Sequence, residues 1–290
     1  MELSVIIVSY NVRDYLKQCL ISTLKASENI DCEIFVIDNN SQDDSTGMVE
    51  KEFPGIILIK NEANKGFSAA NNQAIKLAKG RFILLLNPDT VFEADTFRKC
   101  IGFMDKNYNA GALGVKMVNG NGEFLPESKR SLPTPKTTFF KAFGLSSLFP
   151  GSRIFNSYYV VGIGNSETVP AEVISGAFMF IRHEAINKTG LFDEDFFMYG
   201  EDIDLSYRLL QAGYINYYFP EIQIVHFKGK STLNSNFTDI YHFYNAMRIF
   251  FRKRTVEGKF RGWQYVIIPG IYFREVLAIL NRFLRITFRK

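Results

Sequence analysis

Two adjacent carboxylates, Glu201 and Asp202, stand at the expected start of a helix and are well suited to proton transfer. They follow an apolar, strand-like run, Ser175–Arg182, and a loop. A carboxylate at such a position can take the proton of an attacking hydroxyl. The alternative is that acidic residues here only complement the positive end of a helix. Asp204 suits that structural role, because Arg208 lies four residues further on and can pair with it.

Polar clusters also follow four apolar runs in the first third of the chain. These runs are short, aliphatic and β-branched, as expected of strands that are buried on both faces. Sheets of parallel strands bind ligands at the carboxyl ends of the strands, so four polar loops at one edge outline a binding site. The expected strands are Val5–Val8, Glu33–Ile37, Ile56–Ile59 and Phe82–Leu86, and the clusters after them are Ser9–Asn11, Asp38–Ser41, Asn61–Gly66 and Asn87–Thr90.

Helical patterns alternate with these strands, which predicts an α/β fold with a mostly parallel, doubly wound sheet. The pattern weakens between Val118 and Val169, and this irregular stretch is expected to form a flap on the acceptor side. Further elements are expected where the pattern resumes. They are a helix Glu201–Ala212, two short strands Tyr214–Phe219 and Ile222–Val225, and helices of about Asp239–Lys253 and Gly262–Phe288, the second interrupted at Pro269-Gly270.

The composition is that of a globular protein, and it is rich in aromatic residues. The 290 residues are 47% hydrophobic and 22% charged, and they include 28 Phe and 14 Tyr. Three scattered cysteines show neither a disulfide framework nor metal-binding spacing, which favours a reducing, cytoplasmic environment. The first residues carry no basic leader, so no signal peptide is expected.

Residues 236–290 are predicted to form a basic, aromatic helical extension after a catalytic domain of residues 1–235. Eleven Lys and Arg against two Glu give residues 240–290 a net charge of +9, whereas the whole chain carries +4 and the remainder therefore −5. No apolar run approaches the about 20 residues needed to span a bilayer. Apolar and basic residues at helical spacing are typical of a helix lying on an anionic membrane surface. Packing on the main domain and a dimer interface are the alternatives, and the oligomeric state stays open.

Taken together, these motifs resemble the inverting family 2 glycosyltransferases, and most closely their bacterial rhamnosyltransferase-like branch. The resemblance runs from about Leu3 to about Ser231. It implies a glycosyltransferase A fold, a Rossmann-like sheet flanked by helices, and transfer by a single displacement that inverts the anomeric carbon. The motifs that carry it are Ser9-Tyr10-Asn11, Asp38-Asn39-Asn40-Ser41, Asn64-Lys65-Gly66-Phe67 with Asn71, Asn87-Pro88-Asp89, and Glu201-Asp202.

The resemblance also assigns roles to single residues. Asp38 would accept a hydrogen bond from the ring N–H of uracil or thymine, although an Asp here can also simply form a turn. Gly66 would permit an unusual backbone angle or a close approach by the ligand. Asp202 would be the general base, with Glu201 as the second candidate. The donor-binding residues implied are Ser9, Tyr10, Asn11, Asp38, Asn40, Asn64, Lys65, Gly66, Asn71, Asn87, Pro88 and Asp89.

The segment Asn87-Pro88-Asp89 occupies the place of the family's Asp-x-Asp metal motif. The resemblance implies a Mg²⁺ or Mn²⁺ ion, held by Asp89 and His226, that offsets the charge of the departing nucleoside diphosphate. Asn87 stands where the first Asp of the motif is usual, which removes one negative charge. This departure keeps open a catalytically inactive sugar-nucleotide-binding protein as an alternative.

The expected reaction moves a sugar from a UDP- or dTDP-sugar, with dTDP-rhamnose first, to a hydroxyl of a polyprenyl-linked saccharide in surface polysaccharide synthesis. The substrates come from the resemblance alone. A nicotinamide-dependent oxidoreductase is disfavoured, because Ser9–Asp14 contains no glycine where a dinucleotide fingerprint would need several. No nucleic-acid partner is expected, because the main domain is net acidic.

Overall fold

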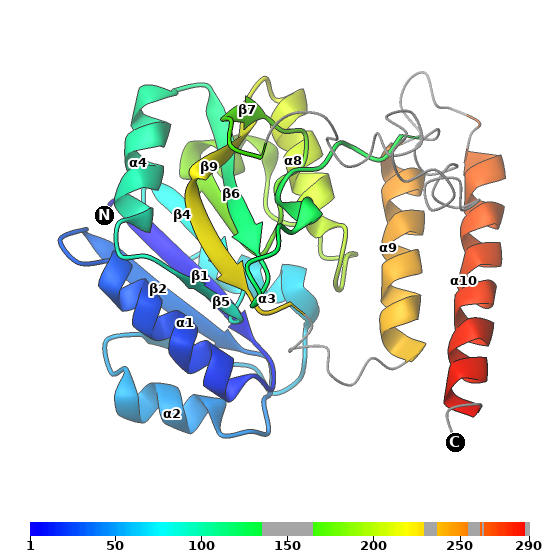
Figure 1. The fold of residues 1–290 in the computed structure, drawn as a ribbon, viewed down its shortest axis with the longest axis horizontal. Helices are drawn as coiled ribbons and strands as arrows, with labels where there is room; N and C mark the ends of the chain where they lie inside the picture. The colour runs from blue at the N-terminus through cyan, green and yellow to red at the C-terminus, as the bar shows by residue number, and fades with distance from the viewer. Residues whose placement is uncertain (135–164, 229–236, 255–261, 263, 288–290) are drawn as a thin grey trace.

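A single mixed sheet forms the centre of the molecule (Figure 1). The computed structural model describes residues 1–134, 165–228, 237–254, 262 and 264–287. Within these residues the strands follow the order β3-β2-β1-β4-β8-β6-β9-β5, and β7 pairs with β9 outside this path. Most of the irregular stretch that was expected to form an acceptor-side flap lies outside the described residues.

The first four strands confirm the parallel arrangement predicted from the alternating pattern. Parallel neighbours need a crossover connection, and the helices between these strands provide it. Every residue of the first strand is buried, as its run of aliphatic residues indicated. The strands are β1 (Leu3–Ser9), β2 (Cys32–Asp38), β3 (Ile57–Lys60) and β4 (Phe82–Leu86).

The other half of the sheet is mixed, so the prediction of a mostly parallel sheet holds only for the first half. Strand β8 runs antiparallel to both β4 and β6, while β6 and β9 are parallel. Strands β5 and β7 each pair antiparallel with β9. These strands are β5 (Thr90–Phe92), β6 (Ala110–Val118), β7 (Val169–Pro170), β8 (Phe178–Arg182) and β9 (Ile215–His226).

Strand β9 is one continuous strand where two short strands were predicted. The predicted break contains Pro220, and a proline cannot donate a hydrogen bond to a neighbouring strand. Pro220 lies in a β-bulge. Val115 of β6 pairs with Phe219, but the next residue, Lys116, pairs with Gln223. Such a bulge keeps the strand in the sheet while shifting its register. It also carries the chain on to His226 at the end of the strand.

Helices cover both faces of the sheet, and the core is divided accordingly. Along β1, Val5 and Ile7 pack into one apolar cluster and Ile6 and Val8 into the other, as the alternation of side chains along a strand requires. Helices α1 (Arg13–Ala26), α2 (Ser45–Glu52) and α4 (Thr96–Lys106) contribute to the first cluster, and α3 (Gly66–Ile75), α7 (His183–Thr189) and α8 (Glu201–Gln211) to the second.

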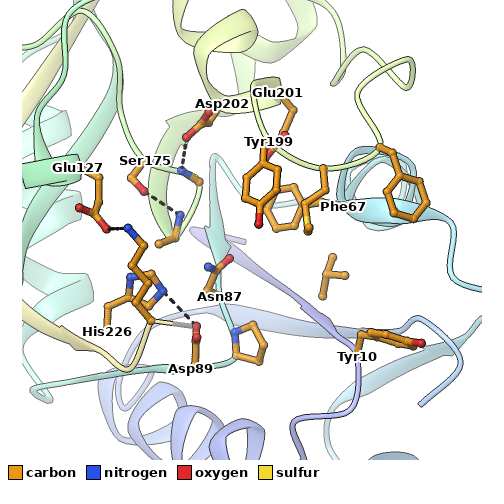
Figure 2. Close-up of a pocket in the computed structure, with 18 of the residues that line it drawn as sticks. Tyr10, Phe67, Asn87, Asp89, Glu127, Ser175, Tyr199, Glu201, Asp202 and His226 are labelled. Carbon is orange, nitrogen blue, oxygen red and sulfur yellow. Dashed lines mark hydrogen bonds and ion pairs between the residues drawn. The ribbon is translucent and has the colours of Figure 1, made fainter. Parts of the chain in front are cut away.

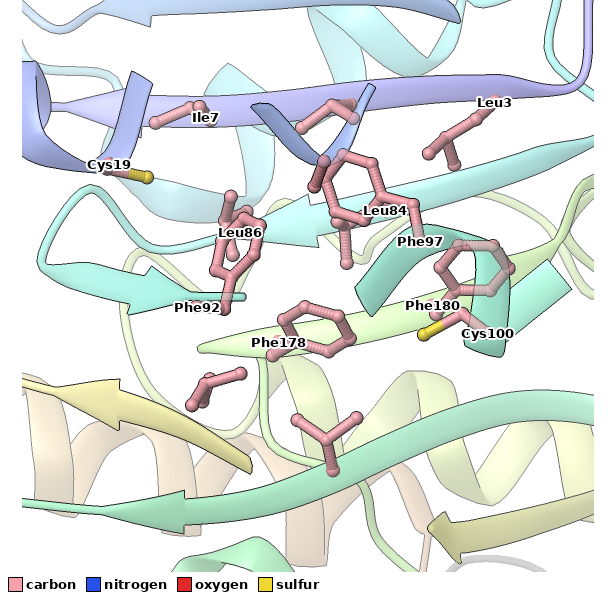
Figure 3. Packing of buried hydrophobic residues seen from close by; sticks show 14 of the residues in the cluster. Leu3, Ile7, Cys19, Leu84, Leu86, Phe92, Phe97, Cys100, Phe178 and Phe180 are labelled. Carbon is pink, nitrogen blue, oxygen red and sulfur yellow. The ribbon is translucent and has the colours of Figure 1, made fainter. Parts of the chain in front are cut away.

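The first cluster combines side chains of strands β1, β4, β6 and β8 with those of the helices that cover this face (Figure 3). Phe97 of α4 belongs to this cluster, as Leu84 and Phe178 of the sheet do, and is fully buried. Full burial of one such side chain contributes about 1.5–3 kcal/mol of transfer free energy. This packing holds the carboxyl ends of the central strands, and the polar loops that follow them, in fixed positions.

Two C-terminal helices, α9 (Phe237–Arg254) and α10 (Gln264–Thr287), lie side by side next to the sheet domain (Figure 1). Helix α10 is continuous through Pro269, so the predicted interruption at Pro269-Gly270 is wrong. A proline inside a helix costs one backbone hydrogen bond. Here Ile267 and Ile271, on either side of it, are buried against Phe251 of α9, which keeps this part of the helix in place.

Candidate active site

A cavity of about 380 Å³ opens at the carboxyl ends of the central strands, beside the start of α8 (Figure 2). Nine of the predicted site residues line it: Tyr10, Asn64, Gly66, Asn87, Pro88, Asp89, Glu201, Asp202 and His226. Six others lie outside its wall: Ser9, Asn11, Asp38, Asn40, Lys65 and Asn71. The wall also holds Asn39, from the motif Asp38–Ser41, and residues that the sequence did not single out, among them Glu127 and Arg130.

Asp38 ends β2 with a buried side chain that has one free acceptor. Its Oδ2 accepts a hydrogen bond from the Ser41 amide at 2.8 Å, so the turn-forming role considered for this residue is present. Its Oδ1 is buried and has no hydrogen-bond partner among the residues that the structure describes. A buried acceptor without a partner costs free energy, and a ligand N–H donated to Oδ1 would remove that cost.

The loops after β1 and β2 are tied to each other. The Asn11 amide donates to Ser41 Oγ at 3.0 Å, and Asn11 Oδ1 accepts from the Gln42 amide at 2.7 Å. Asn11 and Asn40 both have positive φ, at 53° and 68°, a conformation that Asn tolerates better than most residues. In this structure these two asparagines shape the loops around the cavity and do not form its wall.

Gly66 is required by the protein's own backbone. Its φ is +80°, and a Cβ atom at this position would lie 2.4 Å from the Phe197 carbonyl oxygen. The next amide, of Phe67, donates to that same oxygen at 2.7 Å. The unusual backbone angle predicted at Gly66 is present, and the group that approaches it closely is the loop before α8, which is thereby joined to the loop after β3. Asn39 adds a second tie, because its side-chain amide donates to the Gly66 carbonyl at 3.1 Å.

Asp89 and His226 meet because β5 pairs with β9. The pairing places Thr90 opposite His226, and the Phe227 amide donates to the Asp89 carbonyl at 2.9 Å. The buried Asp89 Oδ1 lies 3.2 Å from His226 Nε2, without the geometry of a hydrogen bond, and within the described part of the chain His226 Nδ1 has no hydrogen-bond partner. Figure 2 shows the two side chains facing each other at the cavity.

These two side chains fit a hard divalent cation in part. Carboxylate oxygen and imidazole nitrogen are both ligands that Mn²⁺ accepts, and Mg²⁺ favours the carboxylate. Among the residues that the structure describes, no three His, Cys, Asp or Glu side chains converge on one point. The protein therefore offers Asp89 and His226, and further ligands have to come from the donor's diphosphate or from water.

The rim of the cavity near His226 carries an ion pair that the sequence did not reveal. Lys228 Nζ lies 2.5 Å from Glu127 Oε1, and both residues line the cavity. The Lys228 side chain is 62% exposed, so it can exchange this partner for an anionic ligand. Glu127 follows β6 in a stretch without regular pattern, which is why the sequence gave no signal for it.

Asp202 lies in the first turn of α8 and is held by three donors. Its Oδ2 accepts from Arg130 Nη2 at 2.5 Å and from the Gly176 amide at 3.2 Å, and its Oδ1 accepts from the Ile203 amide at 2.8 Å. The Arg130 and Asp202 side chains are 13% and 12% exposed. The predicted base is thus a buried, ion-paired carboxylate at the cavity wall.

Glu201, its neighbour, is in a different environment. Burial, followed by the charge of Asp202, raises the pKa of the Glu201 carboxyl to about 8. Its Oε2 is buried and accepts no hydrogen bond from any residue that the structure describes. Adjacent carboxyl groups that differ in this way can take different roles: near neutral pH Glu201 holds its proton, whereas Asp202 is paired with a cation.

The free energy of unfolding should therefore depend on Glu201. An unfolded chain loses this proton near the ordinary value of 4.5, but the folded chain keeps it up to about pH 8. The stability that the group contributes is thus fully present below pH 4.5 and is lost as the pH rises to about 8. Glu201→Gln cannot ionise and should be about 2–4 kcal/mol more stable than the wild type at about pH 8.

Denaturant unfolding at about pH 4.5 and about pH 8 measures this difference, with the exposed Glu62→Gln as the matched control. The gain from Glu201→Gln should shrink toward the lower pH. An equal gain at both pH values would show that the proton of Glu201 is not responsible.

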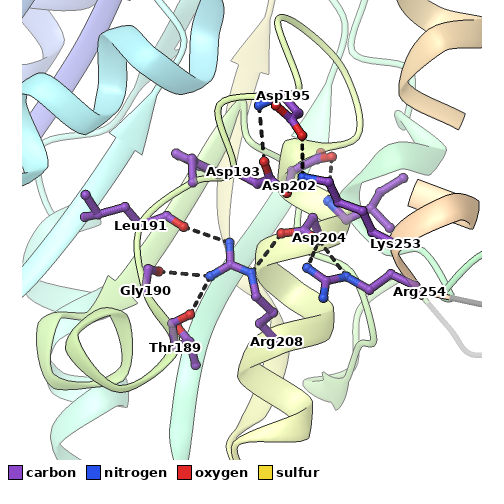
Figure 4. A network of polar contacts seen from close by, with 12 residues as sticks. Thr189, Gly190, Leu191, Asp193, Asp195, Asp202, Asp204, Arg208, Lys253 and Arg254 are labelled. Carbon is purple, nitrogen blue, oxygen red and sulfur yellow. Dashed lines mark hydrogen bonds and ion pairs between the residues drawn. The ribbon is translucent and has the colours of Figure 1, made fainter. Parts of the chain in front are cut away.

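Asp204 has a structural role, as its spacing from Arg208 predicted. It is fully buried and accepts from Arg208 Nε at 2.8 Å. Arg254 of α9 reaches the other oxygen of the same carboxylate, with its Nε at 2.8 Å (Figure 4). Lys253 pairs with Asp193 in the loop before α8. Helix α9 is thereby tied to the helix that carries the two candidate catalytic carboxylates.

Comparison with known proteins identifies the family of this chain. Residues 4–189 match the model of "Glycosyl transferase family 2". The N-acetylglucosaminyl-diphospho-decaprenol L-rhamnosyltransferase of Mycobacterium tuberculosis is 28% identical over 241 residues, which cover 79% of this chain and 77% of the relative. Rhamnosyltransferase WbbL of Escherichia coli K12 is 28% identical over 277 residues, covering 88% of this chain and 95% of the relative.

Solved structures agree on the fold. The mannosyltransferase PcManGT from Pyrobaculum calidifontis, in complex with GDP-Man and Mn²⁺, superposes with a TM-score of 0.61 at 16% identity, covering 96% of this chain and 75% of that one. Staphylococcus aureus TarS 1–349 with UDP-GlcNAc gives 0.60 at 20% identity, covering 94% and 72%. The fold is the glycosyltransferase A fold. Because the family model covers more than half of the sequence, this chain belongs to glycosyl transferase family 2 and is a rhamnosyltransferase-like glycosyltransferase.

Proposed function

We propose that this protein transfers a sugar from a UDP- or dTDP-sugar to a hydroxyl of a lipid-linked saccharide, with inversion at the anomeric carbon. The observation that carries the proposal is the cavity itself. One side of its wall holds Asp89 and His226, the other holds Asp202, and the space between them has the size of a small ligand site. A carboxylate across the cavity from a diphosphate site suits attack from the face opposite the leaving group.

In the proposed reaction Asp202 accepts the proton of the acceptor hydroxyl. The acceptor oxygen forms a bond to the anomeric carbon while the bond from that carbon to the diphosphate oxygen breaks, and its electron pair leaves with the nucleoside diphosphate. Asp89 and His226 would hold a Mg²⁺ or Mn²⁺ ion, which supplies positive charge to the departing diphosphate when it is bound. Lys228 at the rim can add a second positive charge.

The nucleotide base is assigned to Asp38. Its buried Oδ1 has no partner and can accept the ring N–H of uracil or thymine. The two rhamnosyltransferase relatives favour rhamnose as the transferred sugar, and the name of the mycobacterial relative favours a polyprenyl-diphosphate-linked acceptor. The nicotinamide-dependent alternative is discarded, because the chain belongs to a glycosyltransferase family.

A thermal-shift panel tests the donor assignment. UDP or dTDP with Mn²⁺ should raise the melting temperature, EDTA should remove the effect, and GDP, ADP and NAD should have little effect. Stabilisation only by a purine nucleotide would contradict the role of Asp38. Binding without any transfer or donor hydrolysis would favour the inactive sugar-nucleotide-binding protein, to which the substitution of Asn87 for the first carboxylate of the motif points.

The C-terminal helices are proposed to attach the enzyme to the cytoplasmic surface of an anionic membrane. Helix α10 buries an acidic side chain and exposes apolar ones. Glu275 is buried and forms an ion pair with Arg248 of α9. By contrast Tyr265, Phe273 and Phe283 are 77%, 63% and 58% exposed. An apolar face of this kind on a basic segment suits a lipid surface. Among the described residues, no helix is sufficiently long and apolar to cross a bilayer.

Substituting Phe273 and Phe283 by Glu should remove this attachment, because two apolar anchors become negative charges facing anionic lipid. Co-flotation of the full chain with phosphatidylglycerol vesicles measures the binding. Tyr108→Glu, which changes an 81% exposed aromatic residue of the sheet domain, is the control and should still float. If the wild type fails to bind vesicles and instead forms a dimer that the double substitution dissociates, α10 is a subunit interface.

A further inference from the structure

Arg130 reaches Asp202 from a part of the chain that is 72 residues away. It follows the short 3₁₀ turn η1 (Pro126–Ser128), in the stretch where the sequence showed no regular pattern. Its guanidinium nitrogen Nη2 lies 2.5 Å from Asp202 Oδ2. Both side chains line the cavity. The contact is therefore part of the site wall and not an ion pair on the outer surface.

The backbone around Arg130 is fixed to the segment that leads into β8. The Val173 amide donates to the Arg130 carbonyl at 3.0 Å, and the Leu132 amide donates to Glu172 Oε2 at 2.8 Å. Three residues after Val173 comes Gly176, whose amide is the second donor to Asp202 Oδ2. The two groups that hold this oxygen thus come from neighbouring, mutually bonded segments. Arg130 and the Gly176 amide therefore contact Asp202 Oδ2 from two segments whose relative position is fixed by these hydrogen bonds.

The two oxygens of the Asp202 carboxylate accept different numbers of hydrogen bonds. Among the residues that the structure describes, Oδ2 accepts from Arg130 and from Gly176, whereas Oδ1 accepts from the Ile203 amide alone. A carboxylate oxygen has two lone-pair sites. Oδ2 is therefore fully engaged, and Oδ1 keeps one site that can receive the proton of a hydroxyl in the cavity.

We propose that Arg130 is a positioning residue for transfer: it holds Oδ2 of Asp202 so that Oδ1 is presented to the acceptor hydroxyl. The proposal rests on the proposed role of Asp202 as the base. Arg130 suits the task because its planar, permanently charged guanidinium orients a carboxylate, which a single ammonium group does less well. Without it the carboxylate can rotate about its side-chain bonds, and proton transfer depends steeply on such geometry.

The test compares Arg130→Met and Arg130→Lys with the wild type in full-chain enzyme. The donor is dTDP-rhamnose and the acceptor is an N-acetylglucosaminyl-diphospho-isoprenol. We expect kcat to fall about 10²-fold in Arg130→Met and about 10-fold in Arg130→Lys. The dissociation constant of dTDP should change less than about threefold. Arg81→Met removes an exposed pair with Asp105 far from the cavity and is the matched control, expected to keep the wild-type kcat.

Chemical rescue separates positioning from a merely structural role. Arg130→Gly leaves space for a guanidinium ion beside Asp202, so guanidinium at concentrations that do not denature the protein should restore part of the lost kcat. Ammonium chloride at the same ionic strength should restore less. Rescue that follows guanidinium and leaves dTDP affinity unchanged supports the proposal.

Other outcomes overturn it, and each has its own meaning. If Arg130→Met keeps the wild-type kcat while Asp202→Asn is inactive, Arg130 has no positioning role and Asp202 stands as the base. If Arg130→Met loses kcat and dTDP affinity together and guanidinium restores neither, the ion pair only supports the fold. If Asp202→Asn transfers the sugar at the wild-type rate, Asp202 is not the base, and the proposal for Arg130, which rests on that role, is wrong as well.

Discussion

Asp202→Asn is expected to lower kcat for sugar transfer by about 10²–10⁴, the usual contribution of a general base. The amide is nearly the same size as the carboxylate but cannot accept a proton at neutral pH. It also loses the ion pair with Arg130, and its single side-chain oxygen can accept from only one of the Gly176 and Ile203 amides, which donate to different oxygens of the carboxylate. Binding of the nucleotide should change little, because Asp202 lies across the cavity from Asp89.

Glu201→Gln is the matched control for this substitution, because it makes the same chemical change one residue earlier. The Glu201 carboxyl, with a pKa of about 8, holds its proton near neutral pH. An amide replaces a protonated carboxyl with little loss of charge or shape, so this variant should keep most of its kcat at about pH 7. Steady-state transfer assays and dTDP titrations on both variants give the result. Loss of transfer in Glu201→Gln with retention in Asp202→Asn would reverse the assignment of the base.

Asp89→Asn is expected to lower kcat by about 10²–10³ and to remove the stabilisation of the nucleotide complex by Mn²⁺. Asp89 contributes the anionic oxygen of the proposed two-residue cation site, and His226 alone offers a single neutral ligand. The first position of the motif is already Asn87, so no neighbouring carboxylate in Asn87-Pro88-Asp89 can take over. Thermal shift with UDP or dTDP, with and without Mn²⁺, reports the loss directly.

Asn87→Asp provides the opposite change at the same site. It adds the carboxylate that the family's motif usually has, so the Mn²⁺ concentration for half-maximal activity should fall. Asp95→Asn, at an exposed position paired with Lys99, is the neutral control. If Asp89→Asn keeps both its activity and its response to Mn²⁺, the cation is not held by Asp89. If activity in the wild type survives EDTA, transfer does not need the ion.

The parallel half of the sheet could be predicted because its signals are local. Runs such as Val5–Val8 and Phe82–Leu86 are apolar throughout, and a strand buried on both faces needs that composition. Once such strands are parallel, topology places their carboxyl ends at one edge, so the polar loops after β1, β2 and β4 meet. Proline was a weaker guide: Pro220 lies in a bulge and Pro269 inside a helix, because neighbouring pairing and packing outweigh one lost hydrogen bond.

The sequence by itself determined the four parallel strands β1–β4, the helix that begins at Glu201 and the identity of the polar residues that follow the strands, because these depend on side chains close together in the chain. Only the tertiary structure decided which of those residues act together. The pairing of β5 with β9 brings His226 to Asp89, and an irregular segment brings Arg130 to Asp202. It also decided the difference between Glu201 and Asp202, since their desolvation and ion pairing depend on which distant segments pack around them.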